Sequence, residues 1–328
     1  MQIARSLDTV NAETTPSVVS VGNFDGVHCG HQMVLASMVA RARKLSATSG
    51  KPVRSVVVTF DPHPAHVLHT TRRTPLLTPL PEKLDLLAAT GLDLALVLPF
   101  TEDLRRWSPH DFCRRVLCDA LHTAEVHEGE TFRFGYGAEA DVASLSQLGE
   151  EFCFKVHAYE PRILRGAPIS SSRIRALLAA GQVSQARALL GRSFAVRSTP
   201  APGRGYGSRY TVPTINLAPY AEILPANGVY ITTLCIGSDP DSRLFRGVTN
   251  VGNRPTFGAD SFAVETHLLN FEPIALDEAT PLTLTFLHRL RDEHRFPTPE
   301  ALRAQIARDV AKAQRFFTLS DALHIPLT

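Results

Sequence analysis

The chain has 328 residues, of which 44% are hydrophobic and 20% charged, and its formal net charge is only +2. A chain of this length suits about two domains. Its positive and negative charges are nearly balanced, which gives no support to a protein that binds nucleic acid or a membrane surface. We expect small-molecule substrates, no nucleic-acid partner and no membrane partner, with self-association left open. No apolar run approaches the roughly 18 residues of a membrane span, and five scattered cysteines suit reduced thiols. A cytoplasmic protein is expected.

The first half of the chain alternates short apolar runs with amphipathic segments. Strands are predicted at residues 17–21, 55–60, 93–100, 124–127 and 152–159, and helices at residues 31–45, 81–90, 109–120 and 142–151. Apolar strands joined by helices predict a parallel sheet with right-handed crossovers. Ligands of such sheets bind beyond the carboxyl ends of the strands, and the segment GNFDGVHCGH at residues 22–31 lies at that edge.

This segment places two histidines, three residues apart, where a helix begins. If His28 caps that helix, His28 and His31 can face one ligand beside backbone N–H groups that lack an intrahelical partner. Gly22, Gly26 and Gly30 let the backbone approach the ligand closely, and the helix dipole favours an anion. The segment therefore predicts a phosphate site, and the chemistry it suits is nucleotidyl transfer from a nucleoside triphosphate.

Two other interpretations of the segment stay open. One is a zinc site, because zinc-ligand types recur here and further along the chain: His28, Cys29, His31, His63, His66 and His69. Their spacing argues against it, since the adjacent His28 and Cys29 point apart and no C-x-x-C pair exists. The other is a loop whose histidines only cap a helix.

A second polar element, ISSSRIRALL at residues 169–178, begins just before a helical segment predicted at residues 172–190 and forms its first turns. Serine hydroxyls at a helix start can cap backbone N–H groups or donate to phosphate oxygens. Arg173 and Arg175 supply positive charge for a leaving pyrophosphate. The simpler alternative is a serine that only caps the helix, with arginines exposed to solvent. This alternative is less favoured if the element meets the two histidines at one edge of the sheet.

From residue 193 the chain becomes rich in glycine and proline. Strands are predicted at residues 229–235, 244–251, 262–271 and 282–287, followed by a helix at residues 299–317. Several short strands suggest a small antiparallel barrel or sandwich. Apolar positions recur along the helix at steps of three and four, so we expect it to pack on the barrel through Leu302, Ile306, Val310 and Ala313. The predicted fold is an α/β nucleotidyltransferase domain with a Rossmann-like parallel sheet, then a small antiparallel β-barrel domain with a C-terminal helix.

Motifs along nearly the whole chain resemble one family. They are GNFDGVHCGH, VVVTFDPHP (residues 56–64), FRFGYG (132–137), ISSSRIR, TVPTINL (211–217), PANGVY (225–230), GVTNVGNRPTF (247–257), VETHLLNF (264–271) and RLRDEHRF (289–296). Together they resemble the bacterial bifunctional riboflavin kinase/FAD synthetase family. The resemblance implies two activities: ATP-dependent phosphorylation of riboflavin to FMN, and adenylyl transfer from ATP to FMN, which gives FAD and pyrophosphate. It implies an FMN adenylyltransferase domain at residues 1–186 and a riboflavin kinase domain at residues 187–328.

The resemblance also implies roles for residues in the first domain. His28 and His31 match the family's catalytic phosphate-contacting histidines. The ATP-binding positions implied are Gly22, Phe24, Asp25, Gly30, Ser171, Ser172 and Arg175. The flavin side would be lined by Phe60, Asp61, Pro62 and Phe132, for which a turn with core aromatics is the alternative.

In the second domain, Glu265 matches the family's general base. Thr214 and Asn216 match its Pro-Thr-x-Asn pair, which holds Mg²⁺ and the phosphates of ATP, and the upstream glycines Gly203, Gly205 and Gly207 offer a phosphate loop. The chain departs from the family pattern at Ser208, where an arginine is usual, at Thr211, where a glycine is usual, and at Thr131, where Asp or Asn is usual.

Two alternatives to the two-step enzyme stay open. In the first alternative, only the adenylyltransferase is active and the barrel is a degenerate flavin-binding module. In the second, the chain is a non-catalytic flavin or nucleotide sensor. Retention of both histidines, the serine-arginine element and Glu265 argues against the sensor.

Overall fold

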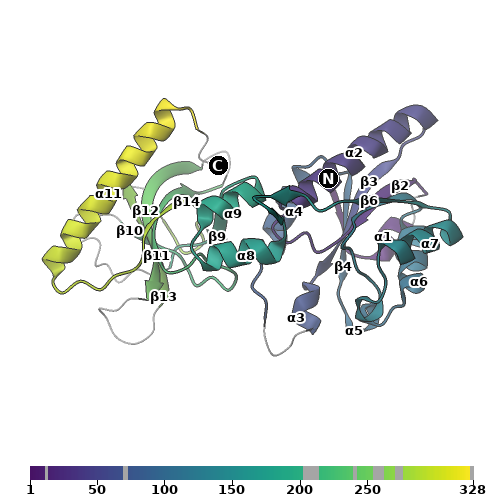
Figure 1. The fold of residues 1–328 in the computed structure, drawn as a ribbon, viewed down its shortest axis with the longest axis horizontal. Coiled ribbons are helices and arrows are strands. Elements are labelled where there is room, and N and C mark those ends of the chain that lie inside the picture. Colours follow the sequence, from purple (N-terminus) through teal and green to yellow (C-terminus); the bar gives the residue numbers. More distant parts are fainter. Residues whose placement is uncertain are drawn as a thin grey trace. The chain divides into compact units, whose positions relative to one another are not determined.

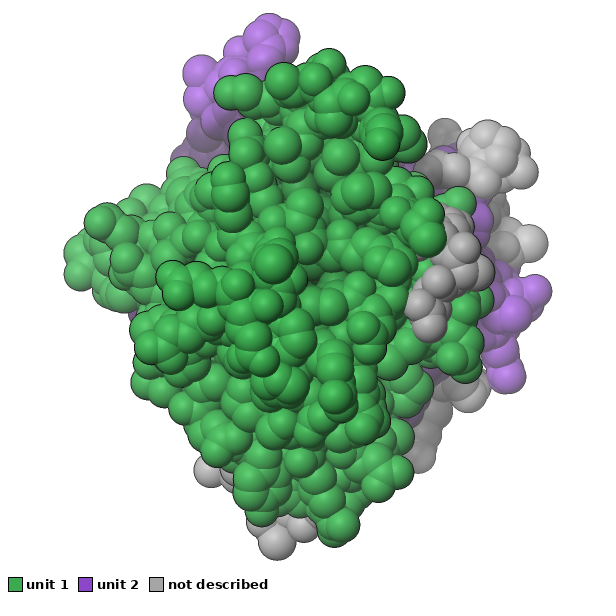
Figure 2. Space-filling view, turned by 90° about the vertical axis from the view of Figure 1, so that its right-hand side faces the viewer, with its two compact units in different colours: residues 1–171 green, residues 172–328 purple. Residues whose placement is uncertain are grey.

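The computed structural model describes residues 1–11, 14–68, 73–201, 214–238, 242–253, 262–269 and 276–325. The chain divides into two compact units, Met1–Ser171 and Ser172–Thr328, which Figure 2 colours green and purple. Each unit has its own sheet. The predicted functional boundary at residue 186 lies fifteen residues beyond this structural division, and it stays a prediction.

A six-stranded parallel sheet forms the centre of the first unit (Figure 1). Its strands, in spatial order, are β1 (Gln2–Ala4), β4 (Leu94–Pro99), β3 (Arg54–Asp61), β2 (Ser17–Val21), β5 (Thr123–Gly129) and β6 (Lys155–Tyr159). From β2 the chain adds β3 and β4 on one side and β5 and β6 on the other. The strand order therefore reverses between β2 and β5, and such a reversal is where open α/β sheets bind ligands.

Helices cover both faces of this sheet, which explains why every residue of β2 is buried. The helical elements of the first unit are α1 (Leu7–Asn11), α2 (Cys29–Ser49), α3 (Pro64–Leu68), α4 (Leu80–Ala88), α5 (Glu102–Arg105), α6 (Pro109–Phe112), a π-helix (Cys113–Ala120), a short 3₁₀ turn (Tyr136–Ala138) and α7 (Val142–Phe152). One face packs on α2 and α4 through a cluster that includes Val18, Leu35 and Leu87. The other face packs on α1, α6, the π-helix and α7. The predicted helix at residues 109–120 is thus α6 running into a π-helix.

The end of the first unit and the start of the second correct one prediction. After the small hairpin β7 (Ile163–Leu164) and β8 (Ala167–Pro168), the chain forms two helices, α8 (Ser171–Ala179) and α9 (Val183–Leu190), where we predicted one helical segment at residues 172–190. The break falls at Gly181, whose φ of +70° is left-handed. A Cβ there would lie 2.7 Å from the Arg289 guanidinium, so only glycine fits without displacement.

The second unit contains the predicted barrel, an antiparallel sheet (Figure 1). Its strands, in spatial order, are β10 (Thr214–Asn216), β13 (Phe262–Leu269), β12 (Arg243–Asn253), β11 (Gly228–Ile236), β14 (Leu282–Arg291) and β9 (Phe194–Ser198). The two edges meet just beyond β9 and β10, because Pro200 bridges to Leu217 and Ala201 N–H donates to the Asn216 carbonyl at 2.8 Å. The sheet therefore closes on itself.

The C-terminal helix α11 (Pro299–Ala322) packs on the barrel, but not along the whole predicted face. Ala313 and Phe317 are buried against β11, β12 and β14, and Val310 packs beside them. Leu302 and Ile306 are each 40% exposed, so their predicted contact with the barrel is wrong. The residue that is buried in this half of the helix is Asp309, which pairs with Arg291 of β14 at 2.9 Å.

Candidate functional site

The segment at residues 22–31 follows β2 directly and leads into α2, so it lies at the carboxyl edge of the sheet where the strand order reverses. Its backbone is unusual: Phe24 and Val27 have φ of +47° and +38°, and Gly26 lies between them at +84°. Left-handed φ is uncommon outside glycine and marks strain that surrounding structure must hold in place. The turn is thus a defined structural feature with its own supports.

The two histidines of the segment lie against each other. His28 is the N-cap of α2, one of the two positions that the sequence left open, and its Nδ1 accepts a hydrogen bond from the His31 backbone N–H at 3.3 Å. A neutral His28 therefore carries its proton on Nε2 and can donate from that atom. The rings stack with centroids 3.6 Å apart and planes inclined by 12°. Burial, with His28 and Lys83 nearby, lowers the pKa of His31 well below its usual range.

Gly30 is what permits this arrangement. A Cβ at residue 30 would lie 3.2 Å from two atoms of the His28 ring, closer than most real Cβ contacts. At Gly22 a Cβ would meet the Phe24 ring at 3.3 Å. Phe24 is buried, and its ring contacts His31 edge-on at a centroid distance of 5.3 Å. These two glycines therefore let aromatic rings pack against the backbone of the turn.

Asp25 supports the turn from below. Its side chain is buried, and its carboxylate accepts hydrogen bonds from the backbone N–H groups of Leu77 and Thr78 at 3.0–3.1 Å. The Thr78 hydroxyl in turn accepts a hydrogen bond from the Gly26 backbone N–H at 3.0 Å. The geometry gives Asp25 a positioning function, since its carboxylate ties the strained turn to the loop before α4.

Lys83 is a residue that the sequence interpretation missed. It lies in α4, is buried, and donates from Nζ to the Asn23 carbonyl at 3.2 Å and to the Thr59 hydroxyl at 3.0 Å. Burial lowers the pKa of Lys83 to about 8, and the carboxylates of Asp25 and Asp61 limit the fall. Its ammonium group adds positive potential at the ends of β2 and β3. A lysine in the first turns of a predicted amphipathic helix gave no signal of burial.

The serine-rich element meets the turn at its first helical residue. The Ser171 hydroxyl donates to the Asp25 carbonyl at 2.8 Å, and the Ile169 carbonyl lies 4.0 Å from the position of a Cβ on Gly30. Residues 146 positions apart in the chain are thus in contact, as a shared sheet edge requires. Ser172, Arg173 and Arg175 belong to the second compact unit, and their part in binding phosphate stays a prediction.

The residues predicted for the flavin side lie at the ends of two other strands. Phe60 and Asp61 end β3, and a cis peptide bond joins Asp61 to Pro62. Phe60 and Phe132 are half-buried and pack at the border of the same apolar cluster. Phe60 also contacts Phe100 edge-on at 5.6 Å. Phe132 follows β5 and stacks on Phe134 at 5.4 Å.

The zinc interpretation of the opening segment finds no support in its geometry. In the described ranges, the histidines at residues 28–31 and 63–66 do not form a group of three potential metal ligands. His63 accepts the Ala65 backbone N–H at 3.1 Å, and the His66 ring contacts the Thr74 carbonyl at 2.8 Å. His69 lies outside the described residues.

In the second unit, strand pairing brings the predicted kinase residues onto one face. The register of β10 with β13 sets Asn216 opposite Glu265 and Thr214 opposite His267. Residues directly opposite in an antiparallel pair point to the same face, with Cβ atoms about 5 Å apart. Asn250 of β12 is opposite Glu265 on its other side and joins that face. The sequence interpretation quoted the segment that contains Asn250 but assigned this residue no function.

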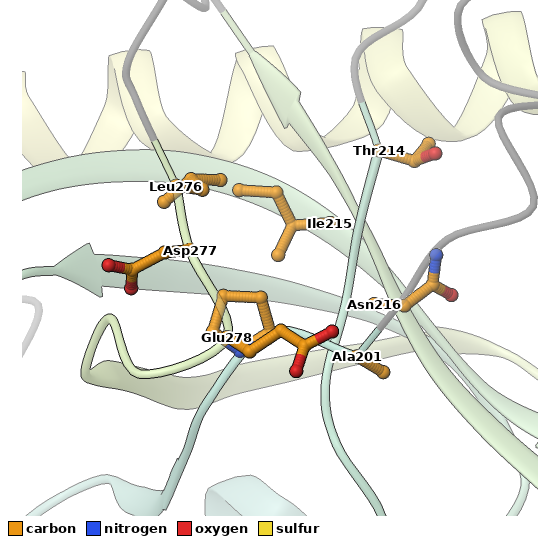
Figure 3. Close-up of a pocket in the computed structure, with 8 residues that line it drawn as sticks. Ala201, Thr214, Ile215, Asn216, Leu276, Asp277 and Glu278 are labelled. Carbon is orange, nitrogen blue, oxygen red and sulfur yellow. The ribbon is translucent and has the colours of Figure 1, made fainter.

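A pocket of about 270 Å³ adjoins β10 (Figure 3). The described residues that line it are Pro200, Ala201, Thr214, Ile215, Asn216, Leu276, Asp277 and Glu278. Figure 3 shows the Thr214 and Asn216 side chains on the same side of β10, while Ile215 points the other way, toward Leu276. The predicted glycines Gly203, Gly205 and Gly207, with Ser208 and Thr211, lie outside the described residues.

On the opposite face of β12 and β13, buried side chains pack together. Three fully buried threonines join their hydroxyls in a row, with Thr249 2.7 Å from Thr232 and 2.9 Å from Thr266. Gly247 makes room for them, because a Cβ there would lie 2.8 Å from Thr266 Cγ2. The row fixes the register of β11, β12 and β13, and thereby the position of Glu265 on the other face.

Two family models match the chain in sequence order, FAD synthetase at residues 10–173 and riboflavin kinase at residues 190–317. Two similar proteins are each named bifunctional riboflavin kinase/FMN adenylyltransferase. The one from Pseudomonas fluorescens is 35% identical over 96% of this chain and 97% of its own length. The one from Escherichia coli K12 is 32% identical over 98% of this chain and 99% of its own length.

A solved structure described as a macrolide-efflux protein from Streptococcus pneumoniae matches the fold with a TM-score of 0.80. The match covers 95% of this chain and 98% of that chain, at 23% identity, and shows the fold alone. In the described part of the chain, no helix combines the length and the apolar character that a membrane crossing requires.

Proposed function

We propose how this chain, which belongs to the bifunctional riboflavin kinase/FMN adenylyltransferase family, divides its two reactions between its two units. The chain phosphorylates riboflavin with ATP to give FMN, and it transfers the AMP unit of ATP to FMN to give FAD and pyrophosphate. One observation carries the division. Both family models match in order, and each matched range holds its own constellation at one edge or face of a separate sheet.

In the first unit, His28 and His31 donate hydrogen bonds to the phosphates of ATP. The phosphate of FMN is the nucleophile and attacks the α-phosphorus, while pyrophosphate leaves. No general base is needed, because that phosphate is ionised at neutral pH. Preorganised donors stabilise the charge that develops in the transition state. Gly22 and Gly30 let ATP approach the turn, Phe24 and Asp25 hold the turn, and Ser171, Ser172 and Arg175 bind the leaving pyrophosphate.

The flavin of FMN lies against the ends of β3 and β5 in this proposal. Phe60, Pro62 and Phe132 offer apolar and aromatic surface to the isoalloxazine ring, and Asp61 offers a hydrogen-bond acceptor. The position of these residues supports this proposal, because they end or follow strands at the same carboxyl edge of the sheet as the histidine turn.

In the second unit, Glu265 accepts the proton of the ribityl hydroxyl as that oxygen attacks the γ-phosphorus of ATP. Thr214 and Asn216 fit a magnesium site, because their oxygens are uncharged hard donors on one side of β10, on the same face as Glu265. Bound there, Mg²⁺ would neutralise phosphate charge. Asn250 and Glu278 complete the polar surroundings, and Gly203, Gly205 and Gly207 are proposed as the phosphate loop.

The functional boundary is proposed at residue 186, with the reactions assigned to residues 1–186 and 187–328. The matched ranges leave residues 174–189 between them, which is the region of α8 and α9. We also place the enzyme in the cytoplasm, where its substrates ATP and riboflavin are used.

The test uses the purified full chain with ATP and Mg²⁺. One reaction receives riboflavin and another receives FMN, and the flavins are separated by chromatography. FMN and then FAD are expected from riboflavin, and FAD is expected from FMN. FAD from FMN without any FMN from riboflavin would instead mean that the barrel is a degenerate flavin-binding module. A chain that binds flavin but makes neither product would be a sensor.

A further inference from the structure

A cluster outside both sites combines one carboxylate and two imidazoles. Glu125 and His127 lie two residues apart on β5, so their side chains share a face, and the register pairs His127 with His157 of the edge strand β6. The three side chains offer ligand atoms that all lie within 4.8 Å of one another. The Glu125 and His127 side chains are only 4% and 3% exposed, whereas His157 is 41% exposed at the rim.

The distances within the cluster match the spacing of donors around one metal ion. Glu125 Oε2 lies 3.1 Å from His157 Nε2 and 3.5 Å from His127 Nε2. A tetrahedral zinc ion bound at about 2.0–2.1 Å holds neighbouring donors roughly 3.3 Å apart. The two observed distances lie on either side of that value.

Neither of these two contacts has the geometry of a well-directed hydrogen bond. Both Nε2 atoms are buried, and neither has a hydrogen-bond partner among the described residues. The His157 Nε2 atom lies 3.1 Å from Glu125 Oε2, which is close enough for a hydrogen bond. Since none is formed by geometry, an N–H bond on this ring nitrogen would not point at the oxygen. Donors that point to a common centre, and not at one another, have this geometry. A buried polar nitrogen without a partner is otherwise costly.

Surrounding side chains hold the cluster as outer ligand shells usually do. The Tyr159 hydroxyl lies 2.7 Å from His127 Nδ1, so Nδ1 can donate its proton there and leave the Nε2 lone pair free. Arg41 of α2 binds Glu125 through two hydrogen bonds of 2.6 and 2.8 Å.

We propose that Glu125, His127 and His157 bind a divalent transition-metal cation, with Zn²⁺ preferred, and leave the remaining position to water. Two imidazoles and one carboxylate are a donor set that zinc accepts readily, whereas Mg²⁺ prefers oxygen ligands. The ion would join the edge strand β6 to β5 and hold this end of the sheet together. The charge of Arg41 opposes the cation, so binding is expected to be weaker than at a closed structural zinc site.

The test measures metal directly on the full chain, after chelator treatment and dialysis. Zinc affinity is taken from competition with a chromophoric indicator, and Co²⁺ is added separately to record its ligand-field spectrum. One zinc per chain and a four-coordinate Co²⁺ spectrum are expected. His157→Gln should weaken zinc binding by at least tenfold and remove the Co²⁺ bands. His157 is at the rim, so this variant should keep the wild-type circular dichroism spectrum and both flavin activities.

A double variant, His28→Asn with His31→Asn, is the matched control, because the opening segment holds a second pair of neighbouring histidines for which a zinc site was considered. Its zinc stoichiometry should equal that of the wild type. Three results would overturn the proposal: no zinc bound by the wild type, unchanged affinity in His157→Gln, or loss of the ion only in the double variant.

Discussion

At the scale of single residues, the opening turn presents two stacked imidazoles at the start of a helix, and one of them, His31, is kept neutral by burial. Neutral rings can donate hydrogen bonds without bringing two positive charges together. The helix dipole and Lys83 supply the positive potential. This division of charge suits the triphosphate binding that we propose for the two histidines.

We predict that His28→Asn lowers the rate of FAD formation from FMN by about 10²–10³-fold, the usual cost of one oxyanion donor. Riboflavin phosphorylation by the same protein should be unchanged. Steady-state kinetics with each flavin measures both. His110→Asn is the control, since His110 lies in the same unit, is 46% exposed and pairs with Glu151 at the surface. An equal loss in the two variants would argue against a catalytic function for His28.

Glu265→Gln should impair the other of the two reactions. Loss of the general base is expected to lower riboflavin phosphorylation by about 10²–10⁴-fold, because general-base catalysis contributes on that scale. FAD formation from added FMN should continue. The exposed Glu300→Gln, in the first turn of α11, controls for loss of a carboxylate from this unit. Wild-type phosphorylation in Glu265→Gln would exclude this residue as the base.

Glu128 gives a prediction about pH. It is buried at the end of β5 and accepts the Val21 backbone N–H, and burial raises its pKa well above the usual value. A raised pKa in the folded state means that this residue stabilises the fold fully at low pH, and that the stabilisation falls as pH rises from about 4.3 toward the folded pKa. Glu128→Gln should remove that loss. Its thermal midpoint relative to wild type should increase between about pH 5 and pH 8, and parallel profiles would contradict the assignment.

Some of these residues could be predicted from the sequence and others could not. The His28 cap follows from local spacing, because a cap involves groups three residues apart. Gly30 was predicted to let a ligand approach the backbone, which stays a prediction; in the structure its missing Cβ makes room for the His28 ring. Asp25 was predicted as a nucleotide-side residue, yet its carboxylate binds the backbone at Leu77 and Thr78, which depends on a contact 52 positions away. The burial of Lys83 depends on tertiary packing in the same way.

At the scale of elements, α11 shows what helical periodicity leaves out. The apolar positions at steps of three and four predicted one packing face, but among the described residues the apolar contacts with the barrel begin only at Val310. In the first half, Asp309 is buried and pairs with Arg291, and Gln305 donates to the same carboxylate at 2.9 Å. The polar pair, and not Leu302 or Ile306, holds this part of the helix.

Two substitutions in α11 separate these contributions. Asp309→Ala should lower the free energy of unfolding by about 3 kcal/mol, because it leaves the Arg291 charge buried without its partner. Ile306→Ala should change it by only about 0.5 kcal/mol, as for an exposed position. Urea denaturation of both variants provides the comparison. A larger loss for Ile306→Ala would restore the packing face that we reject.

Strand pairing explains why the element level was only partly predictable. Among the described residues, five short strands were missed: β1, β7, β8, β9 and β10. Most helices and the other nine strands follow from periodicity and turn residues, so their existence could be predicted. Register could not, and it is register that sets Glu265 beside Asn216 and Asn250, and His127 beside His157. The break at Gly181 was missed because the residues on both sides favour a helix. The left-handed glycine makes the break, and the nearby Arg289 side chain leaves no room for a Cβ there.

At the scale of the whole molecule, the chain is two compact units with separate sheets and separate sets of candidate catalytic residues. The change to a glycine- and proline-rich composition from residue 193 predicted two different modules. The order of the two reactions is the reverse of the order of the units, since the second unit makes the FMN that the first unit consumes. FMN released by one chain should therefore be a substrate for another.

The most direct test of this division is complementation between two inactive full-length variants. His28→Asn supplied with riboflavin, ATP and Mg²⁺ should stop at FMN, and Glu265→Gln should leave riboflavin unchanged. A mixture of the two proteins should convert riboflavin to FAD, because each supplies the step that the other lacks. If the mixture forms no FAD, although Glu265→Gln makes FAD from added FMN and His28→Asn makes FMN, the separation of the two steps as proposed is contradicted.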